Sequence, residues 1–449
     1  MRVKVQVSKQ TLASNLNNSA INYLKKAMTL PNPEYQQGLK YGRYVDHLEP
    51  ELFFYEEPAP GAILFPRGWT RHCLNLIREN DIEPEIEDHR RTLDPVKLQF
   101  KGELRPYQIE AVNEVLSREF GVLQAATGSG KTVMALAVIA KRKQPTLILV
   151  HNKELLYQWA ERIKSFLGIE AGIIGDGKFE IRDITVGLIN SVRKYLDDLP
   201  QYFGFLVADE VQRAPALQYA EAIQGFDAKY MLGLSATPYR RDCLTKLIYI
   251  LLGDRVHEVD PEVLQEIGAV LQPDVIRRET NFRYDYADDY PQMVSALTKD
   301  PDRNKLIADD VVKVSSQGSE VCLVVSDRVK HCTQLATMLA NSGLSIEVLT
   351  GQTPRNERER IVAEVQAGKV NVLISTVQLL GEGFDCSGLS SLFLATPIKF
   401  KGRLLQVIGR ILRPTDGKKP KVFDYVDPRV GVLKYQAKAR EKALEEIAA

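Results

Sequence analysis

The sequence predicts an α/β protein in which two tandem parallel-sheet domains follow a small α/β accessory domain. Three observations support this fold class. Short apolar strands alternate with helical stretches from about residue 104 to 255, the alternation returns after about residue 300, and the first 95 residues show a different, mixed pattern. Because alternating strands and helices form parallel sheets with right-handed crossovers, we expect one such sheet in each half.

The accessory domain is expected at residues 1–95. Alternating apolar and polar residues predict strands there, and longer apolar periodicity predicts helices. The expected elements are a strand at 3–7, a helix at 20–28, strands at 52–55 and 62–65, and a helix at 69–77. Charged residues without apolar periodicity then indicate a linker near residues 88–98.

Apolar runs predict the strands of the two parallel sheets. The first set is expected at 121–123, 146–150, 184–188, 205–208 and 231–234, and the second at 321–325, 346–349, 372–375 and 392–395. We therefore place the first sheet domain at 98–255, a connecting segment at 256–300, the second sheet domain at 301–432 and a C-terminal helix at 433–449.

Composition narrows the class of protein. Hydrophobic residues make up 44% and charged residues 26%, which is ordinary for a globular chain, and the formal net charge of +1 confines any basic surface to a local patch. The five cysteines form no Cys-x-x-Cys pair, which argues against a zinc site or a disulfide framework. No uninterrupted apolar stretch reaches about 18 residues, so we expect no membrane partner and a cytoplasmic location.

A glycine-rich segment follows the first predicted strand of the first sheet domain. Such a turn, running into a helix, cradles phosphate because its backbone N–H groups and the helix dipole face the anion. Lys131 can neutralise the β- and γ-phosphates, and the Thr132 hydroxyl can bind Mg²⁺. We therefore expect ATP and Mg²⁺ as cofactors, bound by Thr127, Gly128, Ser129, Gly130, Lys131 and Thr132. A glycine-rich turn that binds no nucleotide is the alternative.

Two acidic residues end the apolar strand at 205–208. This places both carboxylates at the C-terminal edge of the sheet, beside the phosphates. We expect Asp209 to hold the metal, through water, and Glu210 to orient and deprotonate the attacking water. A helix-capping acidic pair is the alternative interpretation.

Three polar residues far downstream share one spacing. Gln406, Arg410 and Arg413 are separated by i, i+4 and i+7, which places them on one helical face. We expect them to act in catalysis, with Arg410 and Arg413 as arginine fingers that stabilise charge on the transferred phosphoryl group. A solvated helix surface is the alternative. These arginines reach the phosphate only if two halves close over one ATP, which is how a nucleic-acid motor moves.

The ordered set of motifs resembles superfamily 2 helicases and, within them, the XPB/UvsW-like group of double-strand DNA motors. The resemblance covers residues 98–430. It implies two RecA-like domains in an ATP-dependent DNA helicase and translocase that moves 3′ to 5′, closest to phage UvsW-type branch-migration helicases. It also implies duplex, forked or four-way DNA as the partner, and it leaves open a protein partner for processivity.

The resemblance assigns further roles by position. Arg105 and Gln108 are implied as readers of the adenine, and Gly383 and Asp385 as neighbours of the ribose or of the domain interface. The coupling residues are Gln212, where the family usually has His or Asp, with Ser235 and Thr237. The implied strand contacts are Asn152, Lys153, Asn190, Ser191, Arg240, Arg241, Gly351 and Thr376.

One loop departs from the family pattern. XPB-like proteins carry Arg-Glu-Asp in a loop implicated in strand separation, whereas this chain has Arg240-Arg241-Asp242. A second arginine would strengthen phosphate contact, so the strand-separating role stays open.

The accessory domain resembles the small domain of UvsW-type proteins. Basic residues interleaved with aromatic ones predict either a DNA-binding patch or an ordinary aromatic core. The residues concerned are Lys40, Arg43, Arg67 and Arg71, with Tyr41, Tyr44 and Trp69.

Other functions fit the same motifs. One is an XPB-like repair helicase or the motor subunit of a restriction complex. Another is an ATP-gated DNA clamp or annealer, which hydrolyses ATP without displacing a strand. A third alternative is an RNA-sensing ATPase, whose hydrolysis duplex RNA would stimulate.

Overall fold

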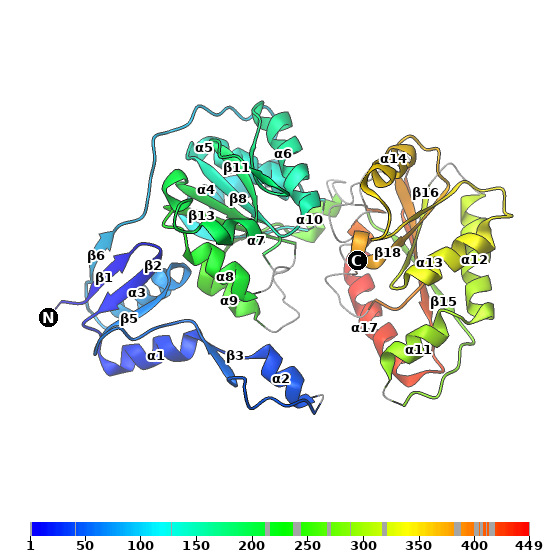
Figure 1. Cartoon of the computed structure of the whole chain (residues 1–449), viewed down its shortest axis with the longest axis horizontal. Helices are drawn as coiled ribbons and strands as arrows, with labels where there is room; N and C mark the ends of the chain where they lie inside the picture. Colours follow the sequence, from blue (N-terminus) through cyan, green and yellow to red (C-terminus); the bar gives the residue numbers. More distant parts are fainter. Residues whose placement is uncertain are drawn as a thin grey trace. The chain divides into compact units, whose positions relative to one another are not determined.

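The structure is a computed structural model, and its elements fall into two units (Figure 1). The first unit comprises residues 1–125 and 130–259, and the second comprises residues 126–129 and 260–449. The described residues are 2–40, 42–126, 128–211, 216–236, 244–266, 271–287, 289–316, 321–380, 388–398, 404, 407–409, 411–412 and 418–448.

The N-terminal part of the first unit is built on a four-stranded sheet in the order β5-β2-β1-β6. Strand β2 is antiparallel to both β1 and β5, while β6 runs parallel to β1. A separate antiparallel pair joins β3 and β4. The elements are β1 Lys4–Val7, β2 Gln10–Ser14, α1 Asn18–Met28, β3 Thr29–Pro31, α2 Pro33–Lys40, β4 Glu51–Phe53, β5 Ile63–Pro66, η1 Arg67–Trp69, α3 Thr70–Arg78 and β6 Glu85–Asp88.

The first parallel sheet has eight strands in the order β10-β9-β11-β8-β12-β13-β7-β14, and only β10 runs antiparallel to its neighbour. Strands β8 and β12 are wholly buried, as expected for apolar runs in a parallel sheet covered by helices. The elements are α4 Pro106–Leu116, β7 Phe120–Gln124, α5 Lys131–Arg142, β8 Thr146–Val150, α6 Lys153–Leu167, β9 Gly172–Gly175, β10 Lys178–Phe179, β11 Ile184–Leu188, α7 Ile189–Val192, η2 Arg193–Tyr195, η3 Pro200–Tyr202, β12 Phe205–Ala208, α8 Ala216–Gln224, β13 Tyr230–Ser235, α9 Thr245–Leu252 and β14 Arg255–Glu258.

The second unit contains a six-stranded, all-parallel sheet in the order β15-β20-β19-β16-β18-β17. Its edge strand β15 comes from the segment that the sequence assigned to a connection, so that segment contributes to the sheet. The elements are α10 Pro261–Glu266, β15 Asp274–Glu279, α11 Tyr290–Leu297, α12 Pro301–Ser315, β16 Val321–Ser326, α13 Val329–Leu339, β17 Ile346–Leu349, α14 Arg355–Gln366, β18 Val372–Thr376, α15 Val377–Leu380, β19 Leu389–Leu394, β20 Lys421–Val426 and α17 Gly431–Ala448.

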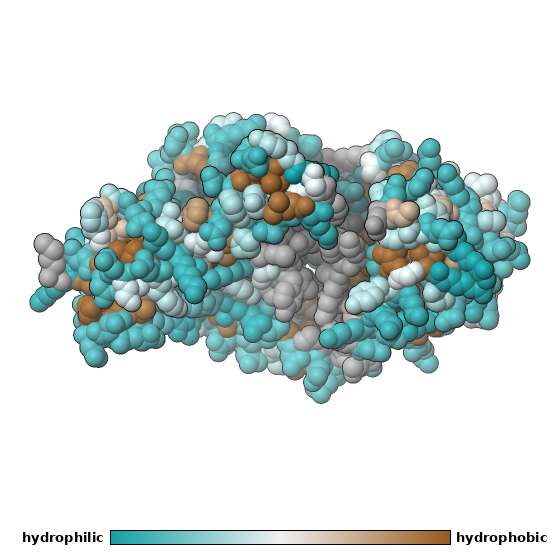
Figure 2. Space-filling view, turned by 90° about the horizontal axis from the view of Figure 1, so that it is seen from below, coloured by the Kyte–Doolittle hydropathy of each residue, from teal (hydrophilic) through white to brown (hydrophobic). Residues whose placement is uncertain are grey.

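Two parallel sheets with helical crossovers confirm the predicted α/β fold class. The predicted domain boundaries stay predictions. On the face shown in Figure 2, hydrophilic residues predominate and apolar residues form small, separate patches. Within the described part of the chain, no helix is both long enough and apolar enough to cross a membrane.

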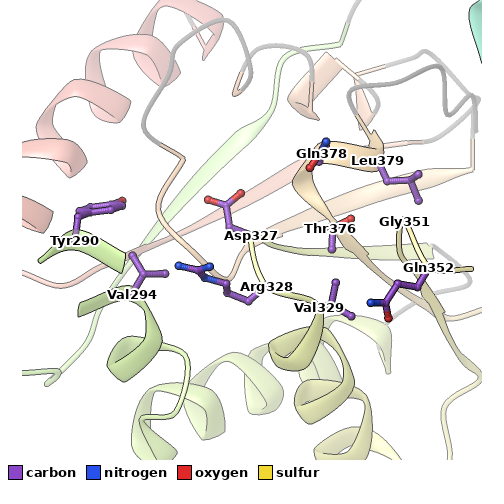
Figure 3. Close-up of a pocket in the computed structure, with 10 residues that line it drawn as sticks. All are labelled: Tyr290, Val294, Asp327, Arg328, Val329, Gly351, Gln352, Thr376, Gln378 and Leu379. Carbon is purple, nitrogen blue, oxygen red and sulfur yellow. The ribbon is translucent and has the colours of Figure 1, made fainter. Parts of the chain in front are cut away.

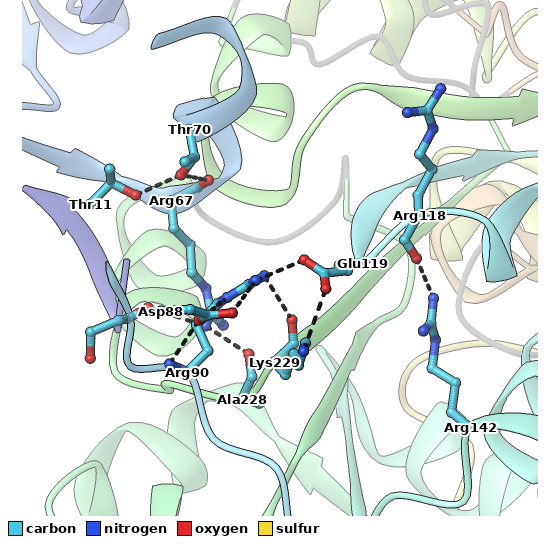
Figure 4. Close-up of polar contacts among 11 residues, drawn as sticks. Thr11, Arg67, Thr70, Asp88, Arg90, Arg118, Glu119, Arg142, Ala228 and Lys229 are labelled. Carbon is cyan, nitrogen blue, oxygen red and sulfur yellow. Dashed lines mark hydrogen bonds and ion pairs between the residues drawn. The ribbon is translucent and has the colours of Figure 1, made fainter. Parts of the chain in front are cut away.

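The N-terminal sheet is docked onto the first parallel sheet through a buried arginine (Figure 4). The Arg67 side chain is 2% exposed, and its Nη1 donates to the carbonyl oxygens of Ala228, at 2.7 Å, and Ser8, at 3.3 Å. Burial lowers the pKa of the Arg67 guanidinium to about 9, which still leaves it protonated at neutral pH. Nearby, Arg90 pairs with Glu119 at 2.8 Å, so several charged groups join the two sheets.

Apolar packing accompanies these polar contacts. The buried core of the N-terminal sheet is continuous with one side of the first parallel sheet, from Phe65 through to Leu251. A Cβ atom at Gly68 would lie 2.6 Å from the carbonyl oxygen of Ile250, so the approach of η1 to α9 requires glycine at this position. The N-terminal sheet is therefore an integral part of the first unit.

This docking corrects part of the predicted DNA-binding patch. Arg67 is buried against backbone carbonyls and is not available to an external phosphate. Trp69 stacks on His72, with ring centroids 4.0 Å apart, and Lys246 Nζ lies 5.6 Å from the centroid of its ring. Tyr44 is 73% exposed, so it remains a candidate for external contact. Tyr41 lies outside the described residues.

We predict that Arg67→Ala lowers the free energy of unfolding by about 2–4 kcal/mol, because the buried Ala228 carbonyl and the partly buried Ser8 carbonyl lose their donor and the large side chain leaves a cavity. Chemical denaturation followed by circular dichroism measures the change. Arg71→Ala is the matched control, since Arg71 lies exposed in the adjoining helix α3 and its loss is expected to cost less than about 0.5 kcal/mol. Equal stability of the two variants would contradict the docking role of Arg67.

Candidate active site

The phosphate loop connects β7 to α5, and its backbone requires glycine. Gly128 and Gly130 have φ values of 93° and 84°, in the left-handed region that side chains other than glycine rarely adopt. Gly130 is also the N-cap of α5, so Lys131 and Thr132 stand in the first turn of that helix. The N–H groups and positive dipole end of α5 therefore face the loop, which is the arrangement that binds phosphate.

Hydrogen bonds fix the loop from both ends. The Lys131 ammonium donates to the Ala125 carbonyl at 2.8 Å, and the Ala125 N–H donates to the carbonyl of Ser235 at 3.0 Å. Ser235 is fully buried at the end of β13, next to β7 in the sheet. The start of the phosphate loop is thus bonded to the start of the predicted coupling motif.

The Asp209 carboxylate lies buried at the end of β12, 6% exposed. Its Oδ1 accepts the Glu210 N–H at 2.9 Å, and its Oδ2 accepts the indole N–H of Trp159 at 2.8 Å. Burial, followed by the charge of Glu210, raises the pKa of Asp209 to about 6, while the Trp159 hydrogen bond and the Lys131 charge oppose the rise. An added cation near this group would relieve the cost of keeping it ionised.

Glu210 occupies a strained backbone conformation. Its φ is 49°, a left-handed value that is uncommon for a residue with a side chain and costs about 1–3 kcal/mol. Neighbouring bonds hold the turn: Tyr219 OH donates to the Asp209 carbonyl at 2.8 Å, and Val211 N–H donates to the Leu234 carbonyl at 3.2 Å. The chain therefore turns sharply at Glu210, just beyond the sheet.

The residues present fit a hard divalent cation. Asp209 and Thr132 supply carboxylate and hydroxyl oxygens, which Mg²⁺ prefers, and a carboxylate has about four acceptor positions. Two of these positions on Asp209 accept protein N–H groups. The rest suit water molecules held by a cation, in keeping with the expected water-mediated contact.

The predicted adenine readers lie beside the loop. Gln108 is 7% exposed; its Oε1 accepts the Arg105 N–H at 2.9 Å and its Nε2 lies 3.3 Å from Tyr107 OH. A Cβ at Gly130 would come within 2.5 Å of Gln108 Nε2, so the amide touches the phosphate loop.

The described strand contacts predicted for the first unit lie at or near the starts of two helices. Asn152 Oδ1 accepts the Leu155 N–H at 2.9 Å and so caps α6, while Lys153 is paired with Asp176. Asn190 is exposed and Ser191 half-exposed, both in the short helix α7. A phosphate at Lys153 would therefore compete with an existing carboxylate partner.

In the second unit, a cavity of about 500 Å³ opens at the C-terminal ends of the strands (Figure 3). It brings together two predicted strand contacts, Gly351 and Thr376, with residues that the sequence reasoning missed: Asp327, Arg328 and Tyr290. In Figure 3 the Arg328 side chain lies between Tyr290 and Thr376. Arg328 is exposed, which suits contact with an anion. Its position, just after the apolar strand β16, was the signal that could have revealed it.

A buried polar network supports the loop that carries Arg328. The Arg328 N–H donates to Ser326 Oγ at 3.1 Å, and Ser326 Oγ lies 2.9 Å from His331 Nδ1. His331 Nε2 lies 2.9 Å from Asn304 Oδ1. Burial, together with the charge of Arg303, lowers the pKa of His331 to about 3. The neutral ring therefore donates from Nε2 and accepts from the serine hydroxyl at Nδ1.

Ten of the predicted site residues lie outside the described part of the chain: Thr127, Gln212, Thr237, Arg240, Arg241, Gly383, Asp385, Gln406, Arg410 and Arg413.

Comparison with known proteins identifies the family. Residues 101–240 match the type III restriction enzyme res subunit family, and residues 304–415 match the helicase conserved C-terminal domain. The DNA 3′-5′ translocase XPB2 of Sulfurisphaera tokodaii is 30% identical over 381 residues, covering 76% of this chain and 86% of the relative.

Solved structures show a related fold. Saccharomyces cerevisiae Dbp5, bound to RNA and ADP BeF3, is 15% identical and aligns with 77% of this chain and 98% of its own, at a TM-score of 0.53. T4 UvsW, 17% identical, aligns with 100% of this chain and 98% of its own, but its TM-score of 0.43 is too low to support an argument. The likeness to Dbp5 agrees with two tandem RecA-like domains.

The predicted resemblance to XPB-like helicases is therefore confirmed: this chain belongs to the XPB-like group of superfamily 2 helicases. It is a DNA-dependent ATPase and helicase that acts on DNA, and the family implies the use of ATP.

We predict that Lys131→Ala reduces ATP hydrolysis by at least about 10²-fold, because one donor that stabilises developing phosphoryl charge is lost. DNA-stimulated phosphate release measures the effect. Lys141→Ala is the control, since Lys141 is an exposed lysine on the same helix and its loss leaves the rate unchanged. Retention of activity in Lys131→Ala would contradict the assignment of the loop.

Proposed function

We propose that this helicase is a double-strand DNA translocase that moves 3′ to 5′ and remodels branched DNA by branch migration or fork regression. The observation that carries the proposal lies at one edge of the first parallel sheet: Lys131 bonds Ala125, Ala125 bonds Ser235 of the coupling motif, and the Lys131 charge acts on the buried Asp209. The similarity to a DNA 3′-5′ translocase supports the direction of movement.

In the proposed mechanism, the loop from Thr127 to Thr132 binds the ATP phosphates, with Lys131 against the β- and γ-phosphates. Arg105 and Gln108 hold the adenine, and Gly383 and Asp385 lie near the ribose or the interface. Thr132 and Asp209 would hold Mg²⁺, which supplies charge neutralisation to the phosphates when it is bound.

Hydrolysis itself is assigned to side chains of this chain. Glu210 orients a water molecule and accepts its proton as the water attacks the γ-phosphate. Arg410 and Arg413, with Gln406, stabilise the charge that develops on the transferred phosphoryl group. The strained turn at Glu210 supports its role, since strained backbone often holds a side chain in a working position.

Movement requires that hydrolysis be coupled to a grip on DNA. Ser235, Thr237 and Gln212 are assigned to this coupling, and Gln212 acts by hydrogen bonding because an amide cannot titrate. Asn152, Lys153, Asn190, Ser191, Arg240, Arg241, Gly351 and Thr376 are assigned to strand contact. Arg328 joins them, because it is an exposed cation in the same cavity as Gly351 and Thr376.

We predict that Arg328→Ala weakens DNA binding whatever the base sequence, and lowers the slope of log affinity against log salt by about 1, because one phosphate contact is lost. Fluorescence anisotropy with duplex DNA at several salt concentrations measures both quantities. Lys330→Ala, which removes an exposed cation two residues away, is expected to leave the slope unchanged. An unchanged slope for Arg328→Ala would remove it from the strand contacts.

The Glu210→Gln variant separates a motor from an ATP-gated clamp or annealer. We predict that it binds ATP but neither hydrolyses it nor migrates a mobile four-way DNA junction, because it has lost the base. The assay measures hydrolysis and junction products together, with linear duplex, single-stranded DNA and duplex RNA as comparison substrates.

DNA holding or annealing that persists in Glu210→Gln, together with no strand displacement by the wild-type enzyme, would favour the clamp or annealer. Stimulation of the wild-type enzyme by duplex RNA alone would favour an RNA-sensing ATPase. If the wild-type enzyme unwinds forks but not junctions, the XPB-like repair or restriction-complex interpretation gains support.

A further inference from the structure

Trp159 connects a helix of the first unit to the buried carboxylate of the active site. Its side chain is 1% exposed, and its Nε1 donates to Asp209 Oδ2 at 2.8 Å. A buried indole N–H needs an acceptor, but the acceptor here is the group assigned to the cation. The spacing of Leu156, Trp159 and Ile163 predicts an apolar helix face, which is why the sequence alone shows Trp159 as a core residue.

The helix that carries Trp159 begins at predicted DNA contacts. Asn152 caps α6, and Lys153 is its first residue. At about 1.5 Å per residue, Trp159 lies about 9 Å along the helix from Lys153. A single rigid element of 15 residues therefore carries a predicted strand contact at its start and the Asp209 donor less than two turns later.

The backbone beside this helix contacts Asp209 as well. The Asp209 N–H donates to the carbonyl of Leu149 at 3.0 Å, just before the turn into α6. That bond holds the backbone of Asp209, whereas the indole bond orients its carboxylate. The strength of a hydrogen bond falls steeply as its donor–hydrogen–acceptor angle departs from a straight line. A small shift of α6 therefore changes the bond between Trp159 and the Asp209 carboxylate more readily than the backbone bond between Asp209 and Leu149.

We propose that Trp159 is a positioning residue that transmits strand contact at the start of α6 to the carboxylate of Asp209. The inference rests on the proposed function, since it takes Asp209 as the metal-holding group and Asn152 and Lys153 as DNA contacts. DNA that engages the start of α6 sets the orientation of the indole N–H, and the indole N–H fixes which oxygen of Asp209 faces the nucleotide.

Trp159→Phe tests the link because it keeps a buried aromatic ring and removes the donor. We expect the DNA-stimulated kcat to fall about 10- to 100-fold, the effect of losing one hydrogen bond to a charged group, with little change in the KM for ATP. The Mg²⁺ concentration for half-maximal activity should also rise. Trp69→Phe is the matched control and should change neither quantity, because Trp69 packs on His72 in the N-terminal part of the unit.

Fluorescence provides a second readout that does not depend on turnover. The chain has two tryptophans, so Trp69→Phe leaves Trp159 as the one tryptophan, which is excited selectively at wavelengths longer than the tyrosine absorption band. In that background we expect the emission to change when Asp209→Asn is added, when Mg²⁺ and a non-hydrolysable ATP analogue are added, and again on addition of duplex DNA.

Each outcome decides a separate claim. The role of Trp159 would be overturned if Trp159→Phe kept the wild-type kcat and Mg²⁺ dependence. It would also be overturned if the emission of Trp159 changed neither with nucleotide nor with DNA. If Trp159→Phe lowers the melting temperature too far for assay, the emission measurement decides. Normal hydrolysis by Asp209→Asn would instead overturn the assignment of Asp209, and with it the proposed function.

Discussion

The shared direction of the parallel strands is the constraint on which the active site depends. Because β7, β12 and β13 run in the same direction, the phosphate loop, the acidic pair and Ser235 all emerge at one edge of the sheet. The bond from Ala125 to Ser235 then ties two of these segments together directly. The second unit repeats the arrangement, since the loops after β16 and β17 meet the end of β18 at one cavity.

Burial sets the electrostatic character of the site. Asp209 is ionised only against the cost of its burial, so the indole N–H of Trp159 and the Lys131 ammonium are its compensating partners. The cost of burying a charge is offset in the same way where buried arginines join distant segments. Arg67 donates to backbone carbonyls, and Arg303 pairs with the buried Asp427 at 2.9 Å. These positive charges are committed to structure, which leaves exposed cations such as Arg328 for external anions.

The sequence predicted what depends on local patterns. Fully apolar runs such as β8 and β12 and the glycine-rich loop were recognisable because their chemistry is contained in a few adjacent residues. It missed β15, which is a charged edge strand, and β14, which interrupts its pairing register with β7. It also missed the buried strands β9 and β20. It also placed Arg67 in an exposed patch, because its acceptors Ser8 and Ala228 are distant in the chain. The acceptor of Trp159 was hidden for the same reason.

The central claim of the proposed function is that ATP hydrolysis moves the protein along duplex DNA. Displacement of a triplex-forming strand from a linear duplex that has one long arm measures this movement directly. The account predicts ATP-dependent displacement that is lost when the strand running 3′ to 5′ toward the triplex is interrupted in that arm, and kept when the complementary strand is interrupted instead. DNA-stimulated hydrolysis without any displacement would contradict it.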